Sequence, residues 1–414
     1  MNKTLFALSI LAIALLAGCR NQNAGNVLDA DDVATVLPEK LITALNGDVI
    51  QLPEGAFFFD RSLSLEGLSD ITIKGAGKGK TVLSFKDQVE GAQGLLVMNV
   101  DGLTLEGFTI QDTKGDAVKV QASRKVIFRD MEATWTGGAS PENGGYGLYP
   151  VDCTEVLIED CEASFASDAG IYVGQSTNVI VRNNYAHHNV AGIEIENTRN
   201  ADVYGNTAKE NTGGLLIFDM PDLPQPNGWK IRVHDNQVEN NNHANFASPG
   251  TVVSTLPPGS GMILMAHKEV EIFGNTIKQH ASVGLSMISW IFTGRPFESD
   301  QYDPFCSAVY IHDNQFVDNT GQVDTTTQFG QLIAAVNQGQ TVDIATDGIF
   351  NPATLGDNGV PAGTARICIR NNGDVRFLNL NAGKGSLPQE IVENMTTDAA
   401  VFDCEGQVIQ AAEH

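Results

Sequence analysis

The sequence is poor in basic residues. Its 25 lysines and arginines stand against 50 aspartates and glutamates, so the 414-residue chain carries a formal net charge of −25. A surface of this sign argues against nucleic acid as a partner and against electrostatic binding to anionic lipid. It also disfavours a polyanionic ligand unless bound cations intervene.

Long apolar runs are scarce too. The one that stands out is LFALSILAIALLA at residues 5–17, whose 13 residues suit a signal peptide but are short for a membrane span. It leads into the tetrapeptide LAGC, which ends at Cys19 and resembles the lipobox of bacterial lipoproteins. We therefore expect residues 1–19 to be a lipoprotein signal peptide and lipobox, Cys19 to carry a lipid such as palmitate, and residues 20–32 to be a polar tether. Lipid would be the only membrane anchor. Arg20, where an aspartate usually means inner-membrane retention, favours the outer membrane.

Cysteine is also infrequent, and no Cys-x-x-Cys-His haem motif occurs. Five cysteines remain after Cys19, and export permits disulfides among them. Cys153 and Cys161 flank a predicted strand that would span roughly 26 Å, which is too far for a bridge. Cys368 lies between two isoleucines, so alternation points it away from the core, and we expect it to pair with Cys404. The pairing of Cys153, Cys161 and Cys306 stays open.

Against these absences stands a repeat. GIEI at 192–195 returns as GLLI at 214–217, 22 residues later, and similar short runs of alternating apolar residues recur along the chain with Gly, Asn and Asp between them. Alternation predicts strands with one buried face, and a period of this size predicts a solenoid. A leucine-rich repeat has a similar period, but its regular leucine pattern is missing. The expected fold is all-β, a parallel β-helix with loop excursions, and the resemblance described next implies that it is right-handed.

These runs are similar to those of the right-handed parallel β-helix superfamily, which includes pectate lyases, mannuronan epimerases and periplasmic proteins of copper-enzyme assembly. The resemblance covers roughly residues 47–320, with remnants to 410. The lipobox, DAGIYVGQS and GIEIEN also resemble an exported proteobacterial lipoprotein family with tandem β-helix repeats, often encoded beside a c-type cytochrome-like protein. That resemblance implies a cell-envelope location and such a partner. It implies no activity.

A column of asparagines follows the second strand of successive repeats: Asn184, Asn206, Asn236, Asn275, Asn314 and Asn372. Stacked asparagines at a bend hydrogen-bond along a solenoid axis, so we interpret them as scaffold rather than as sugar contacts.

The ends of a solenoid need protection. We expect a parallel β-helix over residues 33–320, in which 33–46 form a short N-terminal capping helix. Residues 321–365 read as a loop excursion with a helical turn at 329–336, and residues 366–414 as the final rungs and C-terminal cap.

Four inserts border the strands that begin with glycine, so they are expected to wall a groove along the outer face of those strands. Tyrosine, tryptophan, carboxylates and amides there suit a saccharide. A protein partner would use the same face. The candidate binding residues are Tyr149, Tyr172, Glu194, Glu196, Asn197, Asp219, His267, Trp135 and Trp229.

An enzyme is the alternative, as a polysaccharide lyase, C5-epimerase or glycoside hydrolase. Tyr172 and Lys119 would then be base and acid, and Glu194 with Asp219 would hold a cation such as calcium. Glu194 and Glu196 share one strand face, about 7 Å apart, which suits glycoside hydrolysis by distance. The epimerase signature Asp-Pro-His-Asp/Glu is absent, so binding is preferred over catalysis.

A metal-related role ranks lower still. Met262, Met265, His267, His280 and Met287 lie in two adjacent repeats, and thioether with imidazole suits copper. Methionine is also common core filler, so no metal site is predicted.

Overall fold

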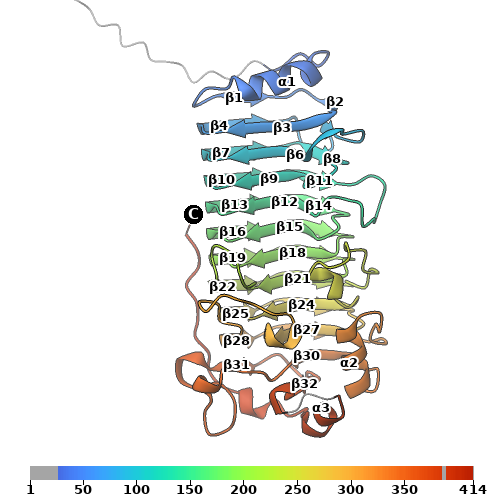
Figure 1. Ribbon diagram of the computed structural model, residues 1–414, viewed down its shortest axis with the longest axis vertical. Coiled ribbons are helices and arrows are strands. Elements are labelled where there is room, and N and C mark those ends of the chain that lie inside the picture. Colours follow the sequence, from blue (N-terminus) through green and yellow to red (C-terminus); the bar gives the residue numbers. More distant parts are fainter. Residues whose placement is uncertain (1–26, 385–387, 414) are drawn as a thin grey trace, which may run out of the picture.

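The computed structural model describes residues 27–384 and 388–413, and their strands stack into one solenoid (Figure 1). Cys19, the lipobox and residues 20–26 of the expected tether lie outside the described residues. Each rung contributes strands to up to three sheets, and successive rungs pair in parallel, so sheet neighbours are three strands apart in sequence over most of the solenoid. This is the topology of a parallel β-helix, as the repeat predicted.

The three sheets differ in strand length. Sheet A contains β1 (Val49–Gln51), β4 (Ser69–Lys74), β7 (Asp101–Glu106), β10 (Arg124–Arg129), β13 (Thr154–Glu159), β16 (Thr177–Arg182), β19 (Arg199–Tyr204), β22 (Trp229–His234), β25 (Lys268–Phe273), β28 (Ser307–His312) and β31 (Ile367–Arg370). Sheet B contains β2 (Gly55–Phe58), β5 (Thr81–Ser84), β8 (Thr109–Gln111), β11 (Glu132–Thr134), β14 (Glu162–Ser164), β17 (Tyr185–His187), β20 (Thr207–Lys209), β23 (Gln237–Glu239), β26 (Thr276–Lys278) and β29 (Gln315–Val317). Sheet C, which includes the glycine-led strands of the repeat, contains β3 (Arg61–Glu66), β6 (Glu90–Met98), β9 (Val118–Gln121), β12 (Tyr146–Val151), β15 (Ala169–Gly174), β18 (Ala191–Glu196), β21 (Gly213–Phe218), β24 (Ser260–Met265), β27 (Val283–Ile288), β30 (Val342–Thr346) and β32 (Phe377–Asn379).

Helices lie toward the two ends. Helix α1 (Val33–Ile42) covers the first rung and buries Val33, Leu37 and Leu41, which are spaced one turn apart. Helices α2 (Gln328–Val336) and α3 (Pro388–Asn394) lie at the other end (Figure 1). Within residues 27–384 and 388–413, no helix has the length and apolar character that crossing a bilayer requires.

The region 321–365 departs from the sequence prediction. It contains the expected helix, but also strand β30, which pairs with β27 and β32 and completes a further rung of sheet C. The sequence signal was weak because no glycine directly precedes VDIAT and the run is only five residues long. Strand β30 of this region therefore belongs to the solenoid, and the rest forms loops and helix.

Two ladders of polar side chains run through the bends. In the predicted one, the Asn206 Oδ1 atom accepts from the backbone N–H and the Nδ2 of Asn184 at 3.0 and 2.9 Å, and Asn206 repeats both bonds to Asn236. The pattern continues through Asn275 and Asn314 to Asn372. The residue before each ladder position adopts a left-handed backbone, which explains why Asp, Asn or Gly stands there, as at Asp235 and Gly205.

The second ladder was missed from the sequence. It joins Asn189, Asn211, Asn241 and Asn319, with His280 taking one step between Asn241 and Asn319 at 3.1 Å on each side. Burial lowers the pKa of His280 to about 4, so the ring is neutral and bridges the two amides. His280 is thus a structural residue.

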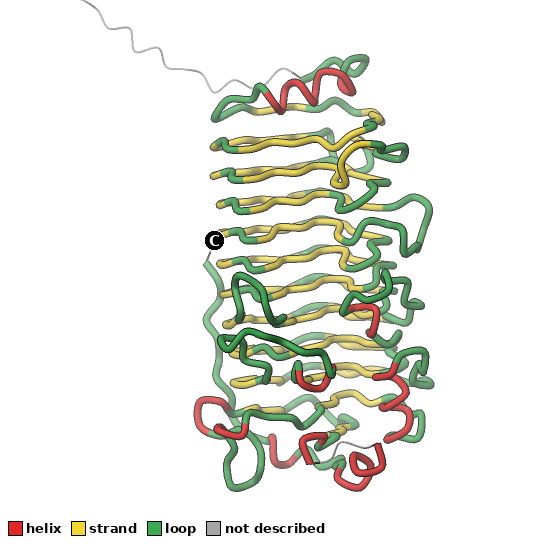
Figure 2. Tube along the Cα trace, in the orientation of Figure 1, coloured by secondary structure: helices red, strands yellow, loops and turns green. Residues whose placement is uncertain are grey.

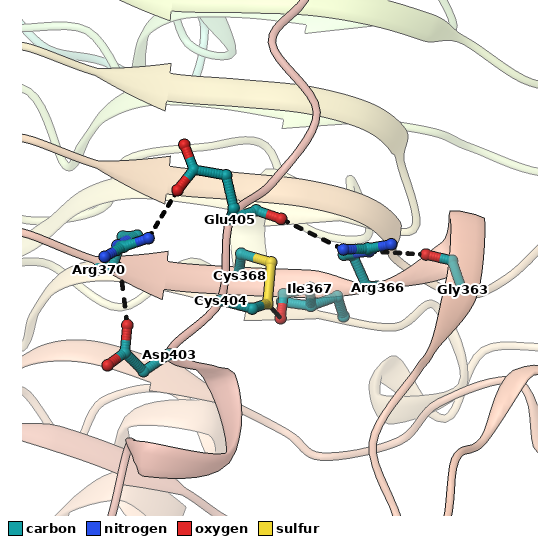
Figure 3. The surroundings of a disulfide bond; sticks show 8 residues. All are labelled: Gly363, Arg366, Ile367, Cys368, Arg370, Asp403, Cys404 and Glu405. Carbon is teal, nitrogen blue, oxygen red and sulfur yellow. Dashed lines mark hydrogen bonds and ion pairs between the residues drawn. A yellow bond between two sulfur atoms is a disulfide. The ribbon is translucent and has the colours of Figure 1, made fainter.

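The C-terminal segment is tied to the last rung of sheet A. Cys368 and Cys404, the pair expected from the sequence, form a disulfide, and Arg370 donates to the Glu405 carboxylate at 2.7 Å beside it (Figure 3). The segment then runs back along the solenoid, where the Ile409 N–H donates to Glu271. Cys153, Cys161 and Cys306 are buried thiols.

The ladder can be tested at Asn206. Replacing it with alanine leaves buried groups on two rungs without partners, so Asn206→Ala should lower the free energy of unfolding by about 1–3 kcal/mol in urea denaturation. Gln237→Ala, at an exposed position of β23, is the matched control and should change it little. Equal effects of the two substitutions on the free energy of unfolding would show that the ladder does not stabilise the fold.

Candidate functional site

The outer face of sheet C carries one continuous column of side chains. Strand register places Lys119 beside Tyr149 and Tyr172 beside Glu194, and then continues through Leu216 and Ile263 to Ser286. The alternation predicted from the sequence is therefore correct along this face.

The prediction that loops wall an open groove is wrong for the C-terminal half of the face. There the loops 219–228, 242–259 and 289–306 fold over the strands, and Figure 2 shows them gathered on the lower rungs. Leu216 and Ile263 pack with Trp290 and Tyr302 into a second hydrophobic cluster. The loops bury apolar surface there because the outward positions of β21 and β24 are themselves apolar.

Hydrogen bonds hold these loops to one another. The Tyr302 hydroxyl donates to the Asp219 carbonyl at 2.6 Å, and Asn227 Nδ2 donates to the Gln301 carbonyl at 2.8 Å. Ser248 joins the 242–259 loop to the Pro141 carbonyl at 2.9 Å. The three loops thus form a fixed roof over the lower half of the face.

The N-terminal half of the same face carries three tyrosines and is open only in part, since the outward positions of β15 and β18 are buried. The rings of Tyr146, Tyr149 and Tyr172 lie 4.4–4.9 Å apart, centroid to centroid. Tyr146 and Tyr149 are half-buried, whereas Tyr172 is only 3% exposed. Two aromatic rings at this site therefore reach solvent, and the third supports them from below.

Carboxyl groups gather beside these rings. The Tyr172 hydroxyl donates to Glu196 Oε1 at 2.6 Å, and Glu194 lies on the same side of β18 two residues earlier. Burial, with repulsion from Glu196, raises the pKa of Asp168 to about 8. Burial raises the pKa of Glu196 to about 7, against the bond from Tyr172, and burial with repulsion from Asp168 raises that of Glu194. Burial and mutual repulsion therefore favour the protonated form of all three carboxyl groups, which interact as one cluster.

Lys119 supplies the positive charge at the site. Its Nζ lies 4.8 Å from the centre of the Tyr149 ring, and its charge partly offsets the effect of burial, which raises the pKa of Asp116. The site thus offers ring faces, a cation and the half-buried carboxyl groups of Asp116 and Asp168, whereas Glu194 and Glu196 are buried at 3% and 7% exposure.

Asp116 and Asp168 were missed from the sequence. Asp168 stands directly before β15, and Asp116 stands two residues before β9. Extending the aligned repeats by two residues toward the N-terminus would have included both carboxylates at the same edge of the face.

Both tryptophans proposed as wall residues lie elsewhere. Trp135 is 4% exposed within the main core, and its Nε1 donates to the Thr113 carbonyl at 2.8 Å. Trp229 begins β22 in sheet A, beside a hollow formed with the C-terminal segment. Trp135 is a structural residue, and Trp229 belongs to another face.

Three polar candidates lie at the buried border of the roof. Asn197 is fully buried and binds the backbone of the 219–228 loop, through Nδ2 to the carbonyls of Met220 and Gln225 at 2.9 and 2.8 Å. Asp219 accepts from the Gly228 N–H at 2.9 Å, and its carboxyl lies 3.5 Å from His267 Nε2. All three therefore hold the loops in place and are closed off from a ligand.

The charge states of Asp219 and His267 agree with this structural role. Burial raises the pKa of Asp219 and lowers that of His267 to about 4, so the ring beside this carboxyl is neutral.

The sulfur and imidazole groups weighed as copper ligands are dispersed. Met262 and Met287 lie in the main core and Met265 lies under the roof, while His280 occupies the second ladder. Among the residues that the structure describes, no group of three or more His, Cys, Asp and Glu side chains is arranged to hold a metal ion.

Comparison with known proteins agrees with the topology. A family model described as "Right handed beta helix region" matches residues 93–219 and 139–292. The pre-neck appendage protein of Bacillus phage phi29 is 26% identical over 247 residues, which are 51% of this chain and 29% of the phage protein. The chain thus spans less than a third of that relative's length.

Solved structures are similar in fold at low identity. DFA-IIIase from Arthrobacter chlorophenolicus A6 is 13% identical, with a TM-score of 0.49 over 86% of this chain and 98% of the enzyme. The A-module of the Azotobacter vinelandii mannuronan C-5 epimerase AlgE4 is 14% identical, with a TM-score of 0.45 over 78% of this chain and 88% of the module. By its strand order and the family match, this protein is a right-handed parallel β-helix.

The carboxyl cluster gives a pH-dependent prediction. The pKa of Asp168 is about 8 in the folded chain, against a usual value of 3.8. The folded chain therefore keeps a proton that the unfolded chain loses as pH rises from about 4 to about 8, and stability falls across this window. Asp168→Asn removes this charge, so it should stabilise the protein more at pH 8 than at pH 5 in thermal denaturation.

Glu142→Gln is the control, since Glu142 is an exposed carboxylate on the 135–145 loop. It should shift the melting temperature equally at both pH values. A gain from Asp168→Asn that is the same at pH 5 and pH 8 would show that Asp168 is not protonated in the folded state.

Proposed function

We propose that this protein binds a saccharide at the open N-terminal half of the sheet C face. The observation that carries the proposal is the tyrosine cluster, whose two half-exposed members stand directly beside Lys119 and the carboxyl groups. Aromatic rings pack on the C–H faces of sugars, and charged or amide groups beside them hold the hydroxyls. Tyr146 and Tyr149 supply the rings, while Tyr172 positions Glu196.

The charge of the site favours a neutral sugar. Asp116 lies near Lys119, Asp168, Glu194 and Glu196 gather beside the tyrosines, and the whole chain is acidic. A polyuronate would meet repulsion here. A hydroxyl-rich neutral chain can instead donate to ionised carboxylates and accept from protonated ones.

Catalysis on the same saccharide is the second candidate. The observation that favours it is the pair Glu194 and Glu196 on one strand face, with Asp168 beside them and their pKa values raised toward neutrality. One protonated and one ionised carboxyl are what acid–base cleavage of a glycosidic bond needs. Turnover of neutral glycans that collapses in Glu196→Gln, with binding retained, would favour the enzyme over the binder.

Binding is tested at Tyr149. Tyr149→Ala removes a ring face, so affinity for a neutral oligosaccharide found on a glycan array should fall by about 0.5–1.5 kcal/mol, roughly twofold to tenfold. Tyr149→Phe keeps the ring and should bind nearly as well. Calorimetric titration measures both. Phe58→Ala, an exposed aromatic residue of sheet B, is the matched control. No binding to any neutral glycan by the unaltered protein would refute the proposal.

We also propose that the protein acts at the outer membrane as a lipoprotein. The support is the LAGC sequence behind the apolar run, and the same resemblance suggests a c-type cytochrome-like protein as an envelope partner. Cys19→Ser should move the protein from the membrane fraction to the soluble fraction, because the thiol is the site of acylation. A variant that still sediments with outer membranes would contradict the anchor.

A further inference from the structure

A cavity of about 470 Å³ lies under the loops at the C-terminal half of the sheet C face. Its deep wall is formed by buried apolar side chains of the sheet, Phe218 from β21 and Ile263 and Met265 from β24. A volume of this size falls in the range of small-molecule sites, roughly 300–1,000 Å³.

The side walls are apolar as well. Val253 and Leu256 come from the 242–259 loop, and both are buried. Phe292 and Phe329 meet edge to face, with ring centres 5.5 Å apart, and thereby join the 289–306 loop to helix α2. Three chain segments distant in sequence thus enclose one apolar space, which favours an apolar ligand over water or a sugar.

Exposed polar residues lie at the rim. Thr255, Thr326 and Gln328 line the cavity and are exposed, whereas Phe218, Ile263 and Met265 on the strands are buried. The cavity therefore has an apolar interior and a polar mouth.

Arg295 is the charged residue of this lining. Its side chain donates to the Thr251 carbonyl at 3.0 Å, and no carboxylate forms an ion pair with it in the described part of the chain. Most arginines on the strands behave differently in this acidic protein, as Arg182 and Arg232 show by pairing with Glu159 and Asp202. A guanidinium with unused donors at the mouth of an apolar cavity suits a single carboxylate.

We propose that this cavity binds a fatty acid, with the alkyl chain between the 242–259 loop, helix α2 and sheet C, and the carboxylate on Arg295. The site is separate from the tyrosine cluster, and the proposal does not depend on saccharide binding. Saccharides would be recognised at the open half of the face, and the fatty acid under the roof.

The test uses dodecanoate and dodecan-1-ol as probes in calorimetric titration of the protein. Dodecanoate should bind saturably, and Arg295→Gln should weaken its binding roughly tenfold or more, because a charge-assisted hydrogen bond is lost. Dodecan-1-ol should bind the two proteins alike. Arg61→Gln, an exposed arginine of β3 at the other end of the solenoid, should leave both probes unaffected.

A second variant tests the cavity itself. Val252 is half-buried in the lining, so Val252→Trp should fill the space and abolish binding of both probes, while circular dichroism shows an unchanged fold. Dodecanoate binding that is absent, or that survives Val252→Trp and Arg295→Gln in folded protein, would overturn the proposal. Glycan binding should be unchanged in both variants, so the two sites can fail independently.

Discussion

From Asn184 and Asn189 onward, two bends of each rung bury backbone groups that a side chain on the adjacent rung satisfies. Asparagine can do this because its oxygen accepts from the preceding rung while its nitrogen donates to a carbonyl and to the next asparagine, as Asn206 does between Asn184 and Asn236. A bend that missed this partner would leave groups costing about 1–3 kcal/mol each. The ladders therefore hold neighbouring rungs in one register. Residues inserted into a rung must consequently form loops outside the stacked strands.

The position of these loops determines where the candidate site lies. The long loops depart beside sheet C, and after β21 they are long enough to reach one another across the face, as the Tyr302 bond to Asp219 shows. Above β18 the one long insert, residues 135–145, leaves Tyr146 and Tyr149 half-exposed. The same strand geometry thus yields an open polar surface on one half and a covered apolar one on the other.

The repeat period and the alternation of apolar residues predicted the features that depend on local sequence. These are the fold, the first asparagine ladder, the column of outward side chains and the Cys368–Cys404 disulfide. The period and the alternation could not predict exposure, because whether a loop walls a face or covers it depends on contacts between loops distant in sequence. Trp135 illustrates the difference. Its place after a short strand is visible in the sequence, but its packing into the core depends on the Thr113 carbonyl, 22 residues earlier, to which its Nε1 donates. Alternation predicted Glu194 and Glu196 of the carboxyl cluster. It did not predict Asp168, which lies just before β15 and outside the alternating strand.

One structural position on successive rungs therefore serves two chemistries. Inward residues must remain apolar to fill the core, so differences between repeats accumulate at outward positions, where Tyr172 and Glu194 give way to Leu216 and Ile263. Glu194 and Leu216 are register partners on adjacent strands, about 4.8 Å apart. The outward side chains therefore change from polar to apolar between β18 and β21, where Asn197 holds the 219–228 loop. Tyr172 and Leu216 still pack in one hydrophobic cluster, so the two halves of the face are joined by buried contacts.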